Sequence, residues 1–310
     1  MSMRIVFFGN PEFCLYPLKK LNSSNHSIVS VVTNPDKKSG RGLKLVSSFV
    51  KKNALELNIP IIEVDDIKSK IFKESLISLK ADLFVVVAFK FLPDSIINIP
   101  KYGSINIHPS ILPKYRGSSP IQYALLNGDS ETGVSIIHLN NKIDSGSILG
   151  QKKINIPSND NFGNMYEKLG HLGSNLLIEV LKNITDSNSK TLIQDESKKT
   201  LAPKIKKEQY RIDWKKSALE IHNQIRAFDP YPGAYSFLNN KRIKFFCSKN
   251  ENNFRYKNVK IGQLIAANNL LFIKSKVGFI SVSQVQLEGK KRVSANDFSR
   301  SLNDKIYILD

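Results

Sequence analysis

Cysteine is almost absent from this chain of 310 residues: only Cys14 and Cys247 occur, and they lie far apart in the sequence. A scaffold held together by disulfides and a cysteine-based zinc or redox motif are therefore both excluded. The five histidines are scattered without the spacing of metal ligands, so we expect no bound metal.

Long apolar runs and a leader-like start are also lacking. No segment approaches the roughly 20 apolar residues that a membrane-spanning helix needs. Residues 1–4 lead directly into the strand-like segment 5–8, without the charged and then apolar layout of a signal peptide. We therefore expect the protein in the cytoplasm.

Glycine-rich phosphate loops are missing as well. Phe8-Gly9-Asn10-Pro11 follows the first strand-like segment but lacks the further glycines of a dinucleotide fingerprint, and no Walker-type lysine loop occurs. We interpret this segment as a strand-to-helix turn that needs a small residue at Gly9.

Acidic residues are scarce relative to basic ones: 27 aspartates and glutamates stand against 46 lysines and arginines, for a net charge of +19. The excess is uneven, because residues 190–310 carry 24 basic and 11 acidic groups whereas residues 1–189 carry 22 and 16. Such an excess is typical of proteins that bind nucleic acid or another polyanion. Lysine, asparagine and isoleucine are abundant throughout, so compositional drift is the alternative explanation of the charge.

Segments of strand and helix character alternate through the first half of the chain. Runs rich in Val, Ile and Phe predict strands at residues 4–8, 28–33, 82–88, 104–108 and 134–139. Helical patterns fall between and after them, at residues 11–21, 50–57, 120–126 and 162–182. This alternation predicts an α/β unit built on a mostly parallel, Rossmann-like sheet with helices on both faces.

The second half changes character after a polar stretch. Residues 189–207 are charged and weakly periodic, which predicts a linker between a first domain at 1–188 and a second at 208–310. A helix is expected at residues 217–227, and short strand-like pieces separated by Gly and Asn follow it. Their spacing is typical of a small antiparallel β-barrel.

The most informative stretch of the chain runs from residue 104 to residue 146. Asn106 and His108 lie two apart in an apolar run, so in a strand their side chains would point to the same face. Asp144 follows a second apolar run and is expected just past a strand end, where open α/β sheets place their ligands. An amide donor, an imidazole and a carboxylate together suit acyl transfer, with a donor for the oxyanion and a His–Asp pair for the proton. Whether His108 or Asp144 accepts that proton stays open.

The same stretch resembles the folate-dependent formyltransferases. Their pattern is Asn-x-His, a Ser-Leu-Leu-Pro-like turn followed by Arg-Gly, and a distant Asp. In this chain it reads Asn106-Ile107-His108, Ser110-Ile111-Leu112-Pro113, Arg116-Gly117 and Asp144. The resemblance covers nearly the whole chain and implies that Asn106, His108 and Asp144 are the catalytic residues.

This resemblance also implies a reaction. A formyl group would move from 10-formyltetrahydrofolate, as co-substrate, to the amino group of methionine on initiator tRNA, and the C-terminal barrel would be OB-like. We expect a monomer. A formyltransferase acting on a small amine, such as an amino-sugar nucleotide, would carry the same catalytic trio and is the alternative. A plain RNA-binding protein on a decayed enzyme scaffold is the rival of another class, and the intact trio argues against it.

The resemblance also implies which residues bind the folate. The family's folate-binding turn corresponds to Ser110, Ile111, Leu112 and Pro113. Its backbone groups and apolar side chains would meet the flat ring of the donor. Phe89 and Leu92, which follow the strand at 82–88, are expected to form a second wall. Arg116 is expected to order the site rather than to take part in the chemistry.

Basic residues are the expected contacts to tRNA. Residues 34–44 form a long, basic, glycine-bearing connection, which is unusual in an α/β unit unless it has a function. It resembles the loop that tRNA-acting members of the family insert toward the acceptor end, and Arg41, between two glycines, is the expected contact. The full expected set is Arg41, Lys44, Lys206, Lys207, Lys290 and Arg292.

Two positions depart from the family pattern. Asn10 stands where the family usually has Thr, and Tyr231 takes the Trp place in an Arg-Ala-x-x-Pro-Trp-Pro-Gly-Ala junction. We expect this junction to pack the two domains together. The sequence leaves open whether either departure weakens activity.

Overall fold

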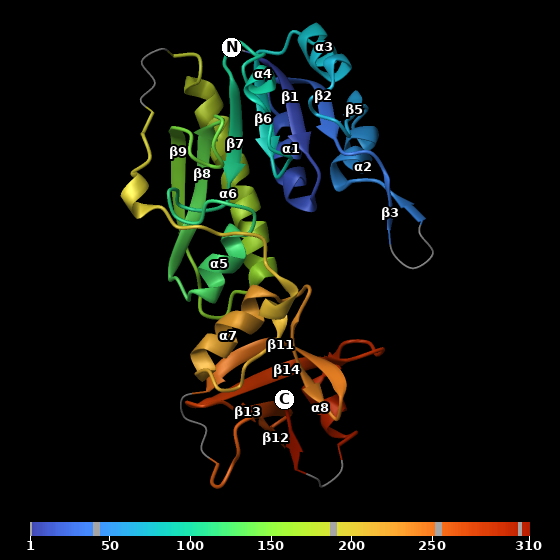
Figure 1. Ribbon diagram of the computed structural model, residues 1–310, viewed down its shortest axis with the longest axis vertical. Helices are drawn as coiled ribbons and strands as arrows, with labels where there is room; N and C mark the ends of the chain where they lie inside the picture. Colours follow the sequence, from blue (N-terminus) through green and yellow to red (C-terminus); the bar gives the residue numbers. More distant parts are fainter. Residues whose placement is uncertain (1, 40–43, 187–190, 252–255, 303–305) are drawn as a thin grey trace. The chain divides into compact units, whose positions relative to one another are not determined.

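The computed structural model describes residues 2–39, 44–186, 191–251, 256–302 and 306–310 (Figure 1). The chain forms two compact units. The first comprises Met1–Pro120, Thr132–Ile154 and Tyr166–Pro203, and the second comprises Ile121–Glu131, Asn155–Met165 and Lys204–Asp310. Two short segments that precede Tyr166 therefore belong to the second unit.

The first unit is built on a seven-stranded sheet with the order β5-β2-β1-β6-β7-β8-β9. Its strands are β1 (Arg4–Gly9), β2 (Ser27–Thr33), β5 (Ile61–Glu63), β6 (Leu83–Val87), β7 (Ser104–His108), β8 (Glu131–His138) and β9 (Ile148–Asn155). Strands β5, β2, β1, β6 and β7 are parallel to one another, and β8 runs antiparallel to β7. The mostly parallel, Rossmann-like sheet predicted from the sequence is confirmed.

The helices of this half of the chain follow the predicted alternation. They are α1 (Leu15–Asn22), α2 (Phe49–Glu56), α3 (Lys70–Ser78), α4 (Asp94–Ile97), α5 (Pro120–Leu126) and α6 (Phe162–Asn183). Serine side chains begin two of them: Ser48 caps α2 and Ser69 caps α3, each accepting a backbone N–H of the first turn. A serine cap therefore begins each of these two helices.

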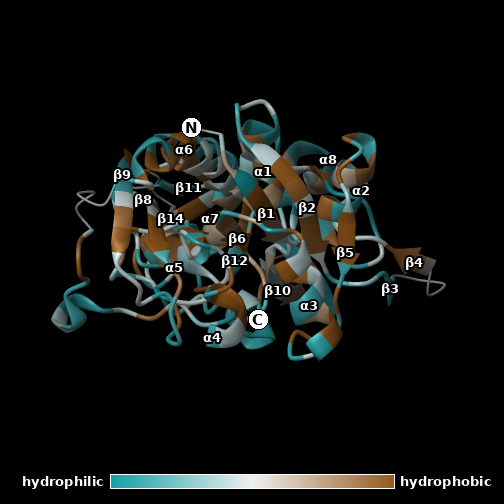
Figure 2. Cartoon of the chain, turned by 90° about the horizontal axis from the view of Figure 1, so that it is seen from above, coloured by the Kyte–Doolittle hydropathy of each residue, from teal (hydrophilic) through white to brown (hydrophobic). Residues whose placement is uncertain are grey.

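The central strands are apolar on both faces, as is usual for parallel strands covered by helices. Every residue of β6 is buried, and so is every residue of β1 after Arg4. Figure 2 shows β1 and β2 in the brown of apolar residues along most of their length. The rings of Phe8 and Phe84 lie 5.1 Å apart at the centre of this core. Burying such side chains supplies most of the free energy that fixes the sheet.

Gly173 lets α6 pack closely against β7, the strand that carries Asn106 and His108. A Cβ at Gly173 would lie 3.0 Å from Ile107 of β7 and 3.3 Å from Val134 of β8, tighter than an ordinary contact. The missing side chain therefore leaves the room that Ile107 and Val134 fill. This packing covers one face of β7 with apolar atoms.

The first unit also contains strands beyond those predicted. β9 occupies the sheet edge next to β8. β3 (Lys37–Ser39), which lies inside the stretch predicted as a loop, pairs as an antiparallel hairpin with β4 (Lys44–Val46), which begins at the last residue of that stretch. At the base of this hairpin, the Nζ of Lys51 lies 2.9 Å from Asp36 and 2.8 Å from Glu63. Lys51 thereby ties the start of the hairpin to α2 and β5.

The second unit is an antiparallel sheet with the order β10-β11-β14-β13-β12-β16, with β15 beside β14. Its strands are β10 (Ala234–Leu238), β11 (Lys241–Glu251), β12 (Gln263–Ala267), β13 (Leu270–Lys274), β14 (Phe279–Leu287), β15 (Val293–Ser294) and β16 (Tyr307–Ile308). The N–H of Asp310 donates to the carbonyl of Phe237 at 3.2 Å, which brings the chain beyond β16 to β10. The sheet is thus barrel-like, and the predicted antiparallel barrel is confirmed.

Two helices accompany this sheet. α7 (Ala218–Ala227) begins with a capping box, in which Ser217 and Glu220 each bond the other's backbone N–H. α8 (Ala295–Ser299) is capped by Ser294. α7 packs against β11 and β14 and is almost entirely buried, which explains its mixture of apolar residues with satisfied polar ones.

The stretch expected as a linker is bonded to the first unit over much of its length. Leu192 and Ile148 exchange backbone hydrogen bonds of 2.8 and 2.9 Å. Further along, Arg116 accepts from the N–H of Ala202 at 2.7 Å and donates to the carbonyl of Thr200 at 2.9 Å. The stretch lacks periodicity because it is held by isolated bridges rather than by a helix or a long strand.

Among the described residues, none of the helices is long and apolar enough to cross a membrane. No group of three or more His, Cys, Asp or Glu side chains that could hold a metal ion occurs in the same part of the chain.

Candidate active site

β7 carries two of the predicted catalytic residues in the middle of the sheet. Its residues are buried except Asn106, which is partly buried. The Oδ1 of Asn106 is inaccessible to solvent and has no hydrogen-bond partner in the described residues. A buried acceptor without a partner costs free energy, so this position fits a ligand that brings its own N–H or O–H.

His108 closes β7 and is only 4% exposed. Its Nε2 lies 2.9 Å from the carbonyl oxygen of Tyr115. A carbonyl oxygen can only accept, so Nε2 carries a hydrogen. The other nitrogen, Nδ1, lies 3.6 Å from Oδ2 of Asp144. That separation is too long for a hydrogen bond but is within ion-pair distance of a protonated imidazole.

Asp144 approaches His108 from the connection between β8 and β9. Its backbone has φ of +48°, in the left-handed region, and its Oδ2 accepts the N–H of Gly117 at 2.8 Å. Asp144 thus lies in the loop between β8, which ends at His138, and β9, which begins at Ile148, and its carboxylate approaches His108 from this loop. The structure brings His108 and Asp144 together, and Asn106 lies two residues from His108 on the same strand.

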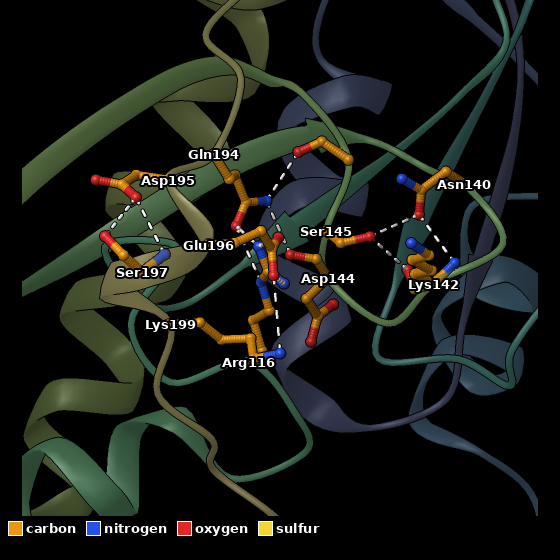
Figure 3. A network of polar contacts seen from close by, with 11 residues as sticks. Arg116, Asn140, Lys142, Asp144, Ser145, Gln194, Asp195, Glu196, Ser197 and Lys199 are labelled. Atoms are coloured by element: carbon orange, nitrogen blue, oxygen red, sulfur yellow. Dashed lines mark hydrogen bonds and ion pairs between the residues drawn. The ribbon is translucent and has the colours of Figure 1, made fainter.

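A polar network holds the backbone at Asp144 and at Gly146, two residues further on (Figure 3). The Nε2 of Gln194 donates to the carbonyls of Asp144 and Gly146, at 2.8 Å each. The Oε1 of Gln194 in turn accepts from Nε and Nη2 of Arg116, at 3.1 and 2.7 Å. Arg116 also makes a two-pronged contact with the Glu196 carboxylate, at 3.1 and 2.6 Å, which lowers the pKa of that carboxyl. Arg116 therefore acts on the site through Gln194.

The predicted folate turn is buried and tightly bonded. Ser110 and Leu112 are almost inaccessible, and the peptide bond from Leu112 to Pro113 is cis. Ser135 of β8 accepts from the N–H of Leu112 at 3.1 Å and donates to the carbonyl of Ser110 at 2.7 Å. Gln151 of β9 donates to the Leu112 carbonyl at 3.1 Å. The turn is thus fixed in shape, and Ile111 remains half-buried beside it.

The predicted second wall divides between core and surface. Leu92 is 3% exposed and belongs to the apolar core around Phe8, and Phe89 is partly buried against the same core. The Phe8 and Phe89 rings meet edge to face at 5.6 Å. Phe91, which lies between Phe89 and Leu92 in the same loop, is 54% exposed. Leu92 is therefore a core residue, and of the two predicted wall residues only Phe89 is partly exposed.

The Asn10 side chain links the end of β1 to the end of β2 through hydrogen bonds. Its Oδ1 accepts the hydroxyl of Thr33 at 3.0 Å and the N–H of Asn34 at 2.9 Å. The Thr33 hydroxyl also lies 2.7 Å from that of Ser48, the cap of α2. An Asn in the family's Thr place is thus accommodated by local hydrogen bonds.

The basic residues expected at the tRNA have different surroundings. Arg41 lies outside the described residues, and Lys44 is the first residue of β4. Lys206, Lys207 and Lys290 are exposed in the second unit. Arg292 is half-buried there, with its guanidinium 3.3 Å from the buried Asp229 and 3.8 Å from the centre of the Phe246 ring.

Sequence analysis missed the residues that hold the site. Gln194 and Thr200 come from the expected linker, and Gln151 comes from the unpredicted strand β9. Thr200 accepts the N–H of Tyr115 at 2.8 Å and so steadies the carbonyl that His108 contacts. A polar residue in a weakly periodic stretch carries no signal of a partner that lies 50 or more residues away.

Fold and site together define a group-transfer enzyme with an α/β unit joined to a barrel-like unit. Residues 3–181 match the family model described as formyl transferase, and residues 204–303 match formyl transferase, C-terminal domain. The chain belongs to the formyl transferase family, as its motifs predict.

Similar proteins narrow this assignment. A methionyl-tRNA formyltransferase of Dictyoglomus turgidum is 41% identical over 300 residues, covering 96% of this chain and 95% of that protein. A methionyl-tRNA formyltransferase of Staphylococcus epidermidis is 37% identical over 308 residues, covering 98% and 97%. Among solved structures, WlaRD, a sugar 3N-formyl transferase crystallised with dTDP and 5-N-formyl-THF, is 25% identical with a TM-score of 0.66, covering 93% of this chain and 99% of that one.

Proposed function

We propose that this protein transfers the formyl group of 10-formyltetrahydrofolate to the amino group of methionine on initiator tRNA, as a step of translation initiation. The observation that carries the proposal is the approach of Asp144 to His108 at the end of β7, the strand that also holds Asn106. It occurs in a chain whose two parts both belong to the formyl transferase family. Relatives named for this activity share 37% and 41% identity over nearly the full length.

The site supplies what amine formylation requires. As the amine attacks, the formyl oxygen gains negative charge, and the Asn106 amide together with a protonated Nδ1 of His108 would donate to it. Removing one donor of this kind typically costs about 2.7–4 kcal/mol of barrier. Asp144 orients His108, and one of these two groups takes the proton that the attacking amine gives up. The bond from the formyl carbon to the folate nitrogen then breaks, and that nitrogen takes up a proton as tetrahydrofolate leaves.

The turn and its neighbours are proposed to hold the folate. Ser110, Ile111, Leu112 and Pro113 would offer fixed backbone groups and apolar atoms to the donor ring, with Phe89 and Leu92 behind the opposite wall. The support is the rigid bonding of the turn by Ser135 and Gln151. A preformed apolar pocket with a few placed polar groups is the usual form of a small-molecule site.

The tRNA would be held by positive charge. We assign backbone contacts to the exposed Lys206, Lys207 and Lys290 and keep Arg292 in the set as a guanidinium already fixed in place. Arg41 and Lys44 stay predictions for the acceptor end. Contacts of this kind give affinity that falls steeply with salt and carries little sequence information.

We further propose a monomer that acts in the cytoplasm, with the catalytic domain at 1–188, a linker at 189–207 and the tRNA-binding domain at 208–310.

The alternative function is formylation of a small amine such as an amino-sugar nucleotide. Its support is the likeness to the sugar 3N-formyl transferase, which covers most of both chains. The uneven basic charge of residues 190–310 favours the tRNA.

An acceptor panel tests the proposal. The purified protein is incubated with 10-formyltetrahydrofolate and, in turn, methionylated initiator tRNA, methionylated elongator tRNA and an amino-sugar nucleotide, and formyl transfer to the amine is followed. Transfer to the initiator tRNA alone is expected. Transfer to the sugar nucleotide without transfer to either tRNA would overturn the proposal in favour of the alternative.

A further inference from the structure

Two consecutive peptide groups around Tyr115 are bonded to one residue of the predicted linker, Thr200. The hydroxyl of Thr200 accepts the N–H of Tyr115 at 2.8 Å, and its backbone carbonyl accepts the N–H of Arg116 at 2.9 Å. The N–H of Thr200 in turn donates to the carbonyl of Pro113 at 3.3 Å. All four residues belong to the first unit. Thr200 therefore holds the chain on both sides of the Tyr115 Cα.

The second of these peptide groups is the one that His108 contacts. A trans peptide is planar and its C=O and N–H point in opposite directions, so the bond from its N–H to Thr200 also fixes the direction of the Tyr115 carbonyl. That carbonyl lies 2.9 Å from Nε2 of His108. In the first peptide group, the Ser110 hydroxyl donates to the carbonyl of Lys114 at 2.6 Å. Both peptide planes are therefore bonded at their C=O and at their N–H.

The backbone of Tyr115 depends on such bonds. Its φ is +64°, in the left-handed region that residues with a side chain disfavour. Its side chain is only 7% exposed, so the residue is also fixed by packing. A rotation of the backbone out of this region would turn the carbonyl away from His108. The contact between the carbonyl and the imidazole therefore depends on the bonds that Thr200 makes.

We infer that Thr200 is a positioning residue for formyl transfer, which acts through Tyr115 to keep the neutral His108 protonated on Nε2 and open on Nδ1. The inference rests on the proposed function, which gives that proton its use. Nδ1 lies 3.6 Å from Oδ2 of Asp144. Without the carbonyl opposite Nε2, the hydrogen can move to Nδ1, where the carboxylate accepts it. The two candidate acceptors of the amine's proton are then engaged with each other.

A set of variants in the full chain isolates the hydroxyl of Thr200. Thr200→Val keeps the branched shape but removes the acceptor of the Tyr115 N–H, and Thr200 is exposed, so no core packing changes. Thr200→Ser keeps the hydroxyl. Thr191→Val makes the same change at another exposed position of the same segment. Ser217→Ala removes the cap of α7 in the second unit and reports the effect of lost stability alone.

The hydrogen on the imidazole is located by ¹⁵N NMR of protein with labelled histidine, at a pH where the ring is neutral. The signals of His108 are assigned by their loss in His108→Gln. Wild-type protein, Thr200→Ser, Thr191→Val and Ser217→Ala are expected to carry the hydrogen on Nε2 alone. Thr200→Val is expected to show a share of rings with the hydrogen on Nδ1. This readout needs neither folate nor tRNA.

Formyl transfer supplies the second readout. In Thr200→Val, kcat is expected to fall by about 10- to 100-fold, because a small misplacement of reacting groups is costly. KM for the folate and for the tRNA should stay within about twofold of wild type, because the hydroxyl acts on the chemical step. Thr200→Ser should recover the wild-type kcat, and Thr191→Val and Ser217→Ala should keep it.

Several outcomes would overturn the inference. Hydrogen on Nε2 alone in Thr200→Val, or hydrogen on Nδ1 in wild-type protein, would show that Thr200 does not set the state of His108. An equal loss of kcat in Ser217→Ala would make stability the cause. If wild-type protein formylates an amino-sugar nucleotide instead of the tRNA, the proposed function fails, and the inference is still decided by the same spectra and by rates with that acceptor.

Discussion

The carbonyl oxygen of Tyr115 lies 2.9 Å from Nε2 of His108 and decides which imidazole nitrogen can gain or lose a proton. Because that carbonyl only accepts, the hydrogen on Nε2 is kept in both charge states. Nδ1, 3.6 Å from Asp144, is then the nitrogen that exchanges a proton. In the proposed reaction we therefore expect a proton to pass on the side of the ring that faces the carboxylate.

Gln194 should matter more than the neighbouring Glu196. Gln194→Leu leaves the carbonyls of Asp144 and Gly146 without their donor, which is expected to lower the free energy of unfolding by about 1–3 kcal/mol. The displaced Asp144 should also slow formyl transfer by roughly tenfold or more.

Glu196→Gln is the matched control, because the Glu196 carboxylate is 62% exposed and its pair with Arg116 is worth at most about 1 kcal/mol. Urea unfolding and transfer rates compare the two variants. Equal losses would contradict a special role for Gln194.

Gly117 has a positive φ and also lies close to the backbone of Ala202, so a side chain is disfavoured there for two reasons. Its φ is +127°, and a Cβ there would lie 2.5 Å from the carbonyl oxygen of Ala202. Gly117→Ala should therefore shift the N–H that Asp144 accepts, and it should lower both activity and the free energy of unfolding, the latter by more than about 1 kcal/mol.

A matched control for Gly117 exists at Gly289, which has φ of +73° with no atom within 4 Å of an added Cβ among the described residues. Gly289→Ala reports the cost of a positive φ alone and should leave the transfer rate unchanged. If both variants lose stability equally, the contact with Ala202 is not the cause.

Acid should weaken the fold through buried histidines. Burial lowers the pKa of His222, whose ring lies between the Ser248 hydroxyl and the Ser158 carbonyl, with the charge of Arg226 acting in the same direction. A folded pKa below the unfolded value of about 6.5 means that stability is fully present above that pH. It is then lost as the pH falls toward the lowered pKa.

Chemical denaturation between pH 7.5 and pH 5.5 checks this expectation, because carboxylates hardly titrate in that window. His222→Gln should flatten the fall in unfolding free energy. Part of the slope should survive, because burial also lowers the pKa of His26 and His138. An unchanged slope in the variant would exclude His222 as a source.

Substituting Lys51 should weaken the reaction with tRNA, although Lys51 is not among the expected tRNA contacts. Lys51→Met removes the ion pairs to Asp36 and Glu63 at the base of the β3–β4 hairpin. If that hairpin presents Arg41 to the acceptor end, KM for the tRNA should rise several-fold while KM for the folate stays constant. Lys52→Met, at the exposed neighbouring position, is the control, and equal effects in both variants would argue against the anchor.

The sequence predicted the elements whose periodicity reflects burial. β7 begins at Ser104 and ends at His108 as expected, because an apolar strand between two others has an unambiguous pattern. β9 escaped prediction, since it lies at the sheet edge and its run Ile148–Asn155 mixes glycine and lysines with few apolar residues. The β3–β4 hairpin has strands of three residues each, Lys-Lys-Ser and Lys-Leu-Val, which are too short to show an alternating apolar pattern.

In the candidate site, the sequence identified the motif residues but not the side chains and carbonyls that hold them in place. Asn106, His108 and Asp144 follow from a compact pattern of residue types, and the approach of Asp144 to His108 needed the structure. The carbonyl of Tyr115 is invisible to any motif, because every residue has a carbonyl and only the fold decides which one is presented. Gln194 depends on a bridge between Leu192 and Ile148 that no local pattern encodes.

A single-turnover experiment with Asp144→Asn tests most directly the claim that formyl transfer occurs at this site. Enzyme in excess over methionylated initiator tRNA, with saturating 10-formyltetrahydrofolate, separates the chemical step from binding. Asn keeps an oxygen for the Gly117 N–H but loses the charge that His108 faces. The account predicts a rate lower by about 10²–10⁴-fold with unchanged tRNA affinity. A rate within twofold of wild type, or an affinity that falls in parallel with the rate, would contradict it.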